Sequence, residues 1–284
     1  MPPTISIIYD QIRWEEKAVR DAALARGIPV NLIDAKKAYF NLVGEEKEPE
    51  NFGDVVLQRC VSYFRNLHIT AILESKGYSV VNSYDVTNVC GNKLLTTLKL
   101  AKAGVPTPKT YVAFTPEGAL KAAEEVGYPL LIKPVIGSWG RLIVPLKDRE
   151  TAEAVFEERL YMFPLYQVYY LQEIVKRPPR DLRVFVIGDE AVAGIYRYSL
   201  DIKTNIARGG KAEACHITDE LREISLKAAE AVGGGILGVD LMELDGGYVV
   251  HEINHTIEFH ATVSVTGVNI PKYILGYLLR KARR

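Results

Sequence analysis

Two carboxylates that could hold a metal ion, Asp240 and Glu252, lie near the carboxyl end of the chain in a predicted hairpin. Apolar residues predict strands over 237–244 and 248–254, and residues 245–247 (DGG) predict the turn, because glycine adopts positive φ without steric cost. If these three residues form the loop, counting outward along both strands places Asp240 directly opposite Glu252.

Two carboxylates opposite each other repel, and a cation between them relieves the repulsion. Asn254 shares their face because it lies two residues beyond Glu252. Two carboxylate oxygens and one amide oxygen form a hard, all-oxygen ligand set, which suits Mg²⁺ shared with a phosphate-bearing substrate. The spacing alone leaves open that the register slips by one residue, or that both acids point to solvent.

A glycine-rich loop and two lysines are candidates for binding phosphate. Residues 137–141 (GSWGR) join two predicted strands, and their glycines allow backbone N–H groups to approach phosphate oxygens closely. The loop matches neither the Walker nor the Rossmann pattern, so an ordinary hairpin turn is the alternative. Lys133 ends the strand before the loop, where an inward ammonium needs an anion, whereas Lys93 begins an earlier helix and is by default a surface residue.

Three arginines and a proline-rich turn could bind further anionic or purine groups. Arg183, Arg197 and Arg208 come from successive segments, and converging arginines bind carboxylates and phosphates through paired hydrogen bonds. The predicted strand 170–175 leads into 176–180 (KRPPR), whose prolines interrupt a sheet ladder and can leave backbone groups free for a purine edge. Scattered surface arginines, and an edge strand followed by a loop, are the alternatives.

The elements that must position these residues change in character along the chain. Strands and helices alternate in the amino-terminal third, which indicates a small parallel sheet. The predicted strands there are 4–9, 30–33, 54–57 and 78–81, and the helices are 14–26 and 63–76. Further on, helices are predicted over 93–103, 116–127, 149–159, 221–232 and 270–283, and strands over 110–114, 130–133, 142–144, 168–175, 182–187 and 191–198, before the acidic hairpin.

Composition narrows the class of protein. The 284 residues are 48% hydrophobic and 25% charged with zero net charge, which argues against a dedicated nucleic-acid or membrane-surface protein. No apolar run approaches the ~20 residues that span a bilayer, and no secretion signal is visible. The three cysteines lack C-x-x-C spacing and the five histidines lack metal-binding spacing, with His251 predicted to alternate away from the acidic face. We expect a cytoplasmic protein.

The order of these motifs resembles the ATP-grasp superfamily over essentially the whole chain. Within the superfamily the chain is similar to the RimK-like branch, and within that branch to the LysX group of lysine-biosynthesis ligases. The segments that carry this resemblance are 89–93 (VCGNK), 133–141 (KPVIGSWGR), 172–175 (QEIV), 181–183 (DLR), 205–211 (NIARGGK), 254–259 (NHTIEF) and 266–268 (TGV).

The resemblance implies a chain of α/β and α+β parts with the ATP-grasp fold. A βαβ domain would occupy residues 1–90, a central lobe 91–170, and a carboxyl-terminal lobe with the metal site 171–284. ATP and Mg²⁺, or Mn²⁺ in its place, would lie between the two α+β lobes. The implied metal ligands are Asp240, Glu252 and Asn254, and the implied cofactor-binding residues are Lys93, Lys133, Gly137, Ser138, Trp139, Gly140, Arg141, Gln172, Glu173, Ile174, Val175, Asp181 and Arg183.

The implied reaction joins the α-amine of 2-aminoadipate to the C-terminal Glu side chain of an acidic, LysW-like carrier protein through an acyl phosphate. The resemblance also leads us to expect a homo-oligomer, either a dimer or a tetramer. The implied catalytic residues are Lys133, Asn205 and Arg208, and the implied substrate-binding residues are Arg197, Asn205, Arg208, Thr256, Ala261 and Thr262.

One departure from the family pattern bears on the substrate. LysX-type enzymes resemble one another in an Asn followed by Ser or Thr after the Glu-Phe pair, whereas glutamate-specific ArgX-type enzymes carry Gly-Phe. Here Thr262 fits the first group and Ala261 fits neither. Aminoadipate is therefore preferred, and glutamate or both substrates remain alternatives. A RimK-like glutamate ligase with another acceptor, and an ATP-sensing module without turnover, are the rival interpretations.

Overall fold

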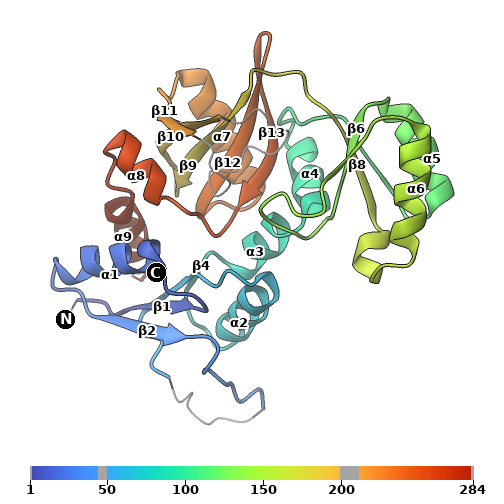
Figure 1. Ribbon diagram of the computed structural model, residues 1–284. Helices are drawn as coiled ribbons and strands as arrows, with labels where there is room; N and C mark the ends of the chain where they lie inside the picture. Colours follow the sequence, from blue (N-terminus) through green and yellow to red (C-terminus); the bar gives the residue numbers. More distant parts are fainter. Residues whose placement is uncertain (1, 44–49, 199–210, 283–284) are drawn as a thin grey trace.

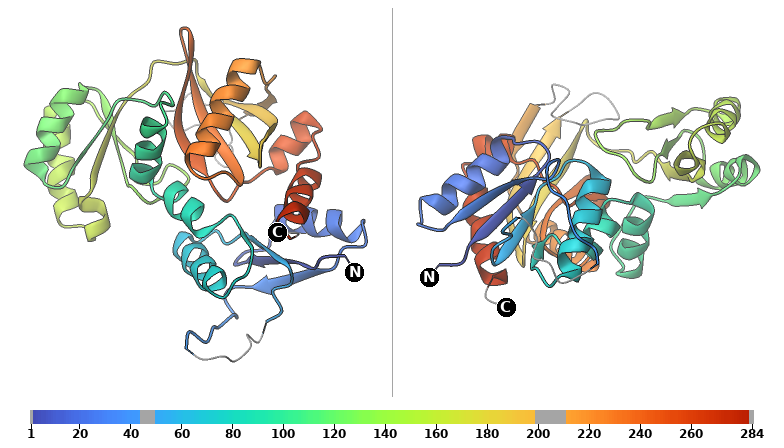
Figure 2. Two further views of the ribbon diagram at one scale, coloured as in Figure 1. Left: turned by 180° about the vertical axis from the view of Figure 1, so that it is seen from behind. Right: turned by 90° about the horizontal axis from the view of Figure 1, so that it is seen from below.

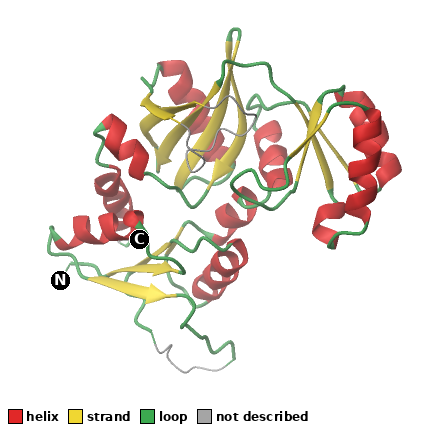
Figure 3. Ribbon diagram, viewed as in Figure 1, coloured by secondary structure: helices red, strands yellow, loops and turns green. Residues whose placement is uncertain are grey.

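The computed structural model describes residues 2–43, 50–198 and 211–282, and the strands within them form three separate sheets (Figures 1 and 3). The first sheet is parallel, as the alternating pattern of the amino-terminal third predicted, and its crossover helices join strands that cannot be linked by a tight turn. Its order is β2-β1-β3-β4, with β1 (Ile5–Tyr9), β2 (Val30–Asp34), β3 (Val55–Gln58) and β4 (Val80–Val81), and the helices are α1 (Trp14–Leu24) and α2 (Tyr63–Ser75).

Two short helices, α3 (Tyr84–Cys90) and α4 (Lys93–Lys102), lead to a second, antiparallel sheet that projects from the rest of the protein, in green in Figure 2. Its order is β5-β8-β6-β7, with β5 (Thr110–Ala113), β6 (Leu130–Lys133), β7 (Val144–Leu146) and β8 (Tyr169–Glu173); the turn η1 (Pro164–Gln167) precedes β8. Helices α5 (Pro116–Val126) and α6 (Arg149–Leu160) cover its outer face (Figure 1). The predicted start of β7 at residue 142 is wrong, because Leu142 has a φ of 58°, which a strand does not accommodate.

The third sheet is antiparallel and carries the acidic hairpin. Its order is β11-β10-β9-β12-β13, and α7 packs on one face of it while α9 packs on the other. The strands are β9 (Arg180–Ile187), β10 (Glu190–Tyr198), β11 (Lys211–Ala214), β12 (Ile236–Leu244) and β13 (Gly247–Asn254), and the helices are α7 (Asp219–Ala231), α8 (His260–Thr266) and α9 (Ile270–Lys281).

The alternation of side chains along β9 and β12 explains where the polar residues point. Leu182 and Val184 of β9 and Leu237 and Val239 of β12 pack toward α7 in one buried cluster. Their neighbours on the opposite face join α9 and the first sheet at one end of the strands, where Phe185 belongs to a second buried cluster. At the other end of the strands, the face that points away from α7 is polar. Charged residues of the third sheet, among them Asp181, Arg183 and Asp240, therefore lie on one surface.

The hairpin brings Asp240 opposite Glu252 as predicted, although by a different route. Leu244 pairs with Gly247, so the turn has two residues between the paired positions and the predicted three-residue loop is wrong. A register shift between Asp240 and Leu241 leaves His251 as an extra residue of β13, which is a β-bulge. The bulge compensates for the shorter turn and restores the pairing of the two carboxylates.

Candidate active site between the three sheets

A cavity of about 560 Å³ is lined by residues of the second and third sheets and by loop and helix residues of the amino-terminal unit, and this volume lies within the usual range for small-molecule sites. The cavity brings together most of the residues that the sequence singled out. Those that line it are Lys93, Lys133, Gly137, Ser138, Trp139, Gly140, Gln172, Glu173, Ile174, Val175, Asp181, Arg183, Arg197, Asp240, Glu252, Asn254 and Thr256.

Five other predicted site residues are not among those lining this cavity. Arg141 lines a separate pocket beside the glycine-rich loop, and its guanidinium lies 4.9 Å from the Trp139 ring centre. Ala261 and Thr262 belong to α8, where Thr262 is 1% exposed. The two remaining residues, Asn205 and Arg208, lie outside the described residues.

Two arginines, the buried Arg197 and the partly buried Arg183, hold the aspartates of the third sheet. Arg183 donates to both carboxylate oxygens of Asp240 at 2.6 and 2.7 Å. Arg197 donates to both oxygens of Asp181 at 2.7 and 2.8 Å and lies 3.2 Å from Asp240 Oδ2. Burial opposes ionisation of Asp240, but Arg183 and then Arg197 hold its pKa below the usual range, so this carboxylate is charged.

Glu252 is held by a lysine from the connection between the first two sheets. Lys93 Nζ lies 3.2 Å from Glu252 Oε1 and donates to the Gly137 carbonyl oxygen at 2.9 Å. Burial raises the pKa of Glu252, but the positively charged neighbours, Lys93 first and Lys133 after it, contribute to a net lowering. Lys93 therefore ties the acidic hairpin to the glycine-rich loop, and the surface position expected by default for it is wrong.

Asn254 completes the predicted oxygen set, and its side-chain nitrogen donates to Asp240 Oδ2 at 3.1 Å. Among the described residues no group of three or more His, Cys, Asp or Glu side chains could hold a metal ion. The chemistry of two carboxylates and an amide is compatible with an ion that would complete its shell with waters and phosphate oxygens, as Mg²⁺ does beside nucleotides.

Lys133 is buried at the end of β6, and its ammonium donates to Gln172 Oε1 at 2.5 Å. Burial lowers the pKa of Lys133 to about 8, against an opposing effect of Glu252. The Gln172 amide is itself fixed, because its nitrogen donates to Thr110 Oγ1 at 3.0 Å and to the Tyr170 hydroxyl at 3.1 Å. The lysine predicted to need an anion thus has a neutral partner and faces the cavity.

The glycine-rich loop has an unusual backbone. Trp139 has a φ of 57° and Leu142 a φ of 58°, values that residues with a Cβ rarely adopt, and Gly140 has a φ of 65°. Such conformations persist where the surrounding structure imposes them, and they concentrate at sites that bind ligands. The loop follows β6 and lines the cavity, and it includes Gly137, whose carbonyl oxygen accepts a hydrogen bond from Lys93.

Sequence reasoning missed part of the cavity wall. Arg13, Val61 and Tyr63 reach it from the amino-terminal unit, and only tertiary packing could reveal them. The prediction that His251 points away from the acidic face is wrong, because the bulge places it on the wall beside Glu252. Burial lowers the pKa of His251 to about 4, so its imidazole is neutral.

Known protein families and individual proteins are similar in sequence to this chain. Residues 90–278 match the RimK-like ATP-grasp domain family, and residues 5–89 match the LysX preATP-grasp domain family. The chain is 39% identical over 274 residues to the alpha-aminoadipate–LysW ligase LysX of Sulfurisphaera tokodaii, covering 95% of this chain and 96% of that protein. It is 33% identical over 285 residues to the glutamate–LysW ligase ArgX of the same organism, covering 96% and 97%.

Two solved structures have a similar fold at lower identity. The RimK domain ATP-grasp protein of Sphaerobacter thermophilus superposes with a TM-score of 0.80 at 22% identity, covering 97% of this chain and 99% of that one. The D-alanine–D-alanine ligase of Bacillus anthracis, in complex with ATP, superposes with a TM-score of 0.69 at 15% identity, covering 100% and 98%.

The three-sheet fold and its central cavity are those of an ATP-grasp enzyme, an ATP-dependent ligase. More narrowly, the chain belongs to the RimK-like ATP-grasp family. The predicted resemblance, fold class and enzyme class are therefore confirmed, while the domain boundaries and residue roles stay predictions. None of the described helices is both long and apolar enough to cross a membrane.

Proposed function

We propose that this protein joins the α-amine of 2-aminoadipate to the C-terminal Glu side chain of a LysW-like carrier protein, with ATP converted to ADP and phosphate. The observation that carries the proposal is that Lys93, Lys133, and the Asp240–Glu252 pair line one cavity although they come from three parts of the chain. Named relatives at 39% identity supply the substrate class.

ATP binds between the second and third sheets. Residues Gln172 to Val175, at the end of β8 and just beyond it, line the cavity and hold the adenine, and the glycine-rich loop covers the phosphates. Lys93 and Lys133 provide positive charge for the phosphate oxygens, and Lys133 is already oriented by Gln172.

Ligation requires an activated carboxylate, because a carboxylate is a poor electrophile at neutral pH. The carrier's side-chain carboxylate attacks the γ-phosphorus of ATP, and ADP leaves, giving an acyl phosphate. The α-amine then attacks the acyl carbon, phosphate leaves, and the nitrogen loses a proton as the isopeptide bond forms. The protein positions the reactants and offsets charge, with Lys133 and Arg208 on the phosphoryl oxygens and Asn205 beside them.

Asp240, Glu252 and Asn254 hold Mg²⁺, or Mn²⁺ in its place, through hard oxygen donors on one wall of the cavity. When bound, such an ion would withdraw negative charge from the phosphates. When ATP and the ion bind, the ion pair between Lys93 and Glu252 would open. Glu252 would then be available to the ion, and Lys93 to the phosphate oxygens.

The carrier approaches beside the proline-rich turn. Lys176 is exposed there, and Arg177 lines the cavity next to it. An acidic carrier fits these cations. The substrate contacts predicted for Arg197, Thr256, Ala261 and Thr262 remain part of the proposal, although Thr262 would act from within α8 rather than from the cavity wall.

Glutamate is the second candidate substrate, because the ArgX relatives are 33% identical to this chain and Ala261 fits neither specificity pattern. The deciding experiment incubates the enzyme and a LysW-type carrier with ATP and each amino acid and measures the carrier by mass spectrometry. A mass increase equal to aminoadipate less one water supports the proposal. An unchanged carrier in both reactions, with intact ATP, rejects it.

A further inference from the structure

One guanidinium of the cavity wall, that of Arg13, comes from the amino-terminal unit and has no assigned role. Arg13 precedes α1, and its backbone N–H donates to Glu16 Oε2 at 2.7 Å. Its side chain returns to the same carboxylate, with Nη2 donating to Glu16 Oε1 at 2.8 Å and Nε to Oε2 at 3.3 Å. One edge of the guanidinium is thereby fixed against α1.

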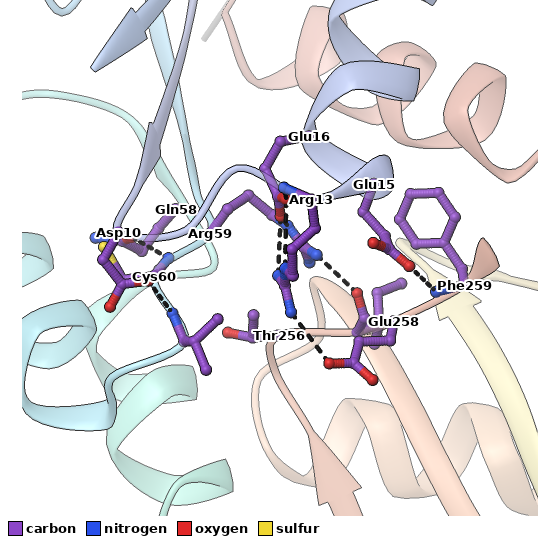
Figure 4. A network of polar contacts seen from close by, with 12 residues as sticks. Asp10, Arg13, Glu15, Glu16, Gln58, Arg59, Cys60, Thr256, Glu258 and Phe259 are labelled. Atoms are coloured by element: carbon purple, nitrogen blue, oxygen red, sulfur yellow. Dashed lines mark hydrogen bonds and ion pairs between the residues drawn. The ribbon is translucent and has the colours of Figure 1, made fainter. Parts of the chain in front are cut away.

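Glu16 is itself immobilised, since it is fully buried and also accepts a hydrogen bond from Arg59 Nε at 2.9 Å. Arg59, only 4% exposed, donates through Nη2 to the Ile257 carbonyl oxygen at 2.8 Å (Figure 4). This chain of contacts links α1, the end of β3 and the segment after β13. Arg13 is therefore held in one orientation before any ligand arrives, which reduces the entropy lost on binding.

The free edge of Arg13 faces a carboxylate on the same cavity wall. Its Nη1 lies 3.1 Å from Oε1 of Glu258, whose side chain is 46% exposed while that of Arg13 is 19% exposed (Figure 4). A fixed cation and a half-exposed anion thus lie side by side at the boundary between the amino-terminal unit and the third sheet.

This pair is not needed to join the two units. Glu15 Oε1 accepts hydrogen bonds from the backbone N–H groups of Phe259 and His260, both at 3.1 Å, and Arg59 already binds the Ile257 carbonyl. Both contacts are buried, whereas an exposed ion pair adds only about 0–1 kcal/mol. The Arg13–Glu258 pair is therefore free to open for a ligand at little loss of stability.

Building on the proposed function, we propose that Arg13 and Glu258 bind the amino-acid substrate by its zwitterionic end, Arg13 taking the α-carboxylate and Glu258 the α-ammonium. An α-amino acid carries these two opposite charges on adjacent positions, so it can replace the direct Arg13–Glu258 contact with two contacts of its own. The group that must become the nucleophile then lies on Glu258, in the cavity that also contains the proposed metal ligands.

The third sheet offers no equally open site. Arg197 is 4% exposed, and its Nε and Nη2 are already bound to Asp181, with Nη2 also near Asp240. Arg183 is bidentate with Asp240. Displacing either arginine would leave a buried aspartate with fewer partners, whereas displacing Glu258 from Arg13 exposes its carboxylate to water.

The test compares Arg13→Gln and Glu258→Gln with the wild-type enzyme, and uses Arg20→Gln as a matched control. Arg20 belongs to α1, the helix that Arg13 precedes, but its guanidinium contacts the exposed Asp21 and it does not line the cavity. Binding of 2-aminoadipate and of glutamate is measured by titration calorimetry, and ligation is measured through the KM for each amino acid and for ATP.

Loss of a charge-assisted hydrogen bond predicts that the Kd and KM for the amino acid rise about 10- to 100-fold in both cavity variants. The KM for ATP and the melting temperature of Glu258→Gln stay near the wild-type values, as do all values for Arg20→Gln. An analogue of 2-aminoadipate with an amide in place of the α-carboxylate tests for direct contact. This analogue lacks the charge that Arg13 is proposed to bind, so the wild-type enzyme and Arg13→Gln should bind it equally weakly.

Unchanged amino-acid affinity in both variants overturns the inference, and so does an equal loss of affinity for the acid and its amide accompanied by a lower melting temperature. The proposed function fails separately, through a wild-type enzyme that modifies no carrier. Amino-acid binding that still depends on Arg13 and Glu258 in calorimetry would support this site even then.

Discussion

Arg183 donates two hydrogen bonds to Asp240, from Nε at 2.6 Å and from Nη2 at 2.7 Å, on the wall of the central cavity. Asp240 therefore has a buried cation as its partner without a metal ion. If Asp240 binds an ion as proposed, that ion adds further positive charge beside Arg183 and Arg197, and an anionic ligand helps to offset it. The proposed site therefore favours an ion that arrives with the phosphates of a nucleotide.

The first prediction contrasts this pair with a neighbouring pair of the same geometry. Arg180 is bidentate with Glu243 at 2.6 and 3.0 Å, but these side chains are 28% and 19% exposed, against 16% and 4% for Arg183 and Asp240. Asp240→Asn leaves the largely enclosed guanidinium of Arg183 without its ionic partner, so we expect it to lower the free energy of unfolding by about 3–5 kcal/mol.

Glu243→Gln is the control, with an expected loss of about 0–1 kcal/mol because water solvates the unpaired Arg180. Urea denaturation at neutral pH measures both values. If both variants lower the free energy of unfolding equally, the lower exposure of the Arg183–Asp240 pair does not increase its contribution to stability.

The second prediction concerns Glu252, the other member of the facing carboxylates. Glu252→Gln removes a charged oxygen donor from the proposed metal set and the ionic partner of Lys93 at 3.2 Å. We expect Mg²⁺-dependent ADP formation to fall by two orders of magnitude or more, about the effect of losing a transition-state charge contact. Glu190→Gln, an exposed carboxylate on β10, serves as the control. Full activity at ordinary Mg²⁺ concentration would remove Glu252 from the metal site.

Much of the fold could be predicted because its elements have regular patterns. Strands β1 and β3 of the first sheet are short apolar runs buried on both faces, and the amphipathic helices α5 and α7 follow the 3.6-residue period that burial on one face produces. The short elements α3, β11 and α8 were not predicted, because four to seven residues hold too few apolar positions to define a period.

The candidate site was predictable where neighbours in space are close in sequence, and not elsewhere. Asp240 and Glu252 share a hairpin, so counting along it found their pairing, although the turn length and the bulge at His251 were both missed. Arg13 and Glu258 are 245 residues apart and meet only because α1 packs against the segment after β13. No local pattern could indicate that contact.

The third prediction follows from the lowered pKa of Lys133. Burial brings this pKa to about 8, so the ammonium loses its charge as the pH rises through that value in the absence of ligand. Because phosphate binding needs the charged form, we expect the KM for ATP to rise above pH ~8. Lys133→Arg, whose guanidinium stays charged, should flatten this pH dependence. A wild-type KM that is constant across this range would contradict the assignment of Lys133 to the phosphates.

Stability provides an independent check of the same pKa. The unfolded chain binds this proton with the ordinary pKa of 10.5, and the folded protein binds it with a pKa of about 8. Between these values the unfolded state holds more protons, so the contribution of Lys133 to the free energy of unfolding increases with pH. Lys133→Met should lack that increase in a comparison of denaturation curves across the same pH range.

The fourth prediction concerns docking of the carrier beside the proline-rich turn. Arg180 is already neutralised by Glu243 and stacks 4.0 Å from the Tyr196 ring centre, and Arg177 donates to the carbonyl oxygens of Pro178 and Arg180. Lys176 is the exposed cation of this turn, so it is the residue on which long-range attraction to an acidic partner should depend most.

Screening shortens that attraction to about 8 Å at physiological ionic strength, so the KM for the carrier should rise with added salt while the KM for ATP changes less. Lys176→Gln should raise the carrier KM at low salt and reduce its salt dependence. Lys121→Gln, an exposed lysine on the outer helix α5, should leave both unchanged. Salt screens the attraction between exposed charges. A wild-type KM for the carrier that does not change with salt would therefore show that docking does not depend on such charges.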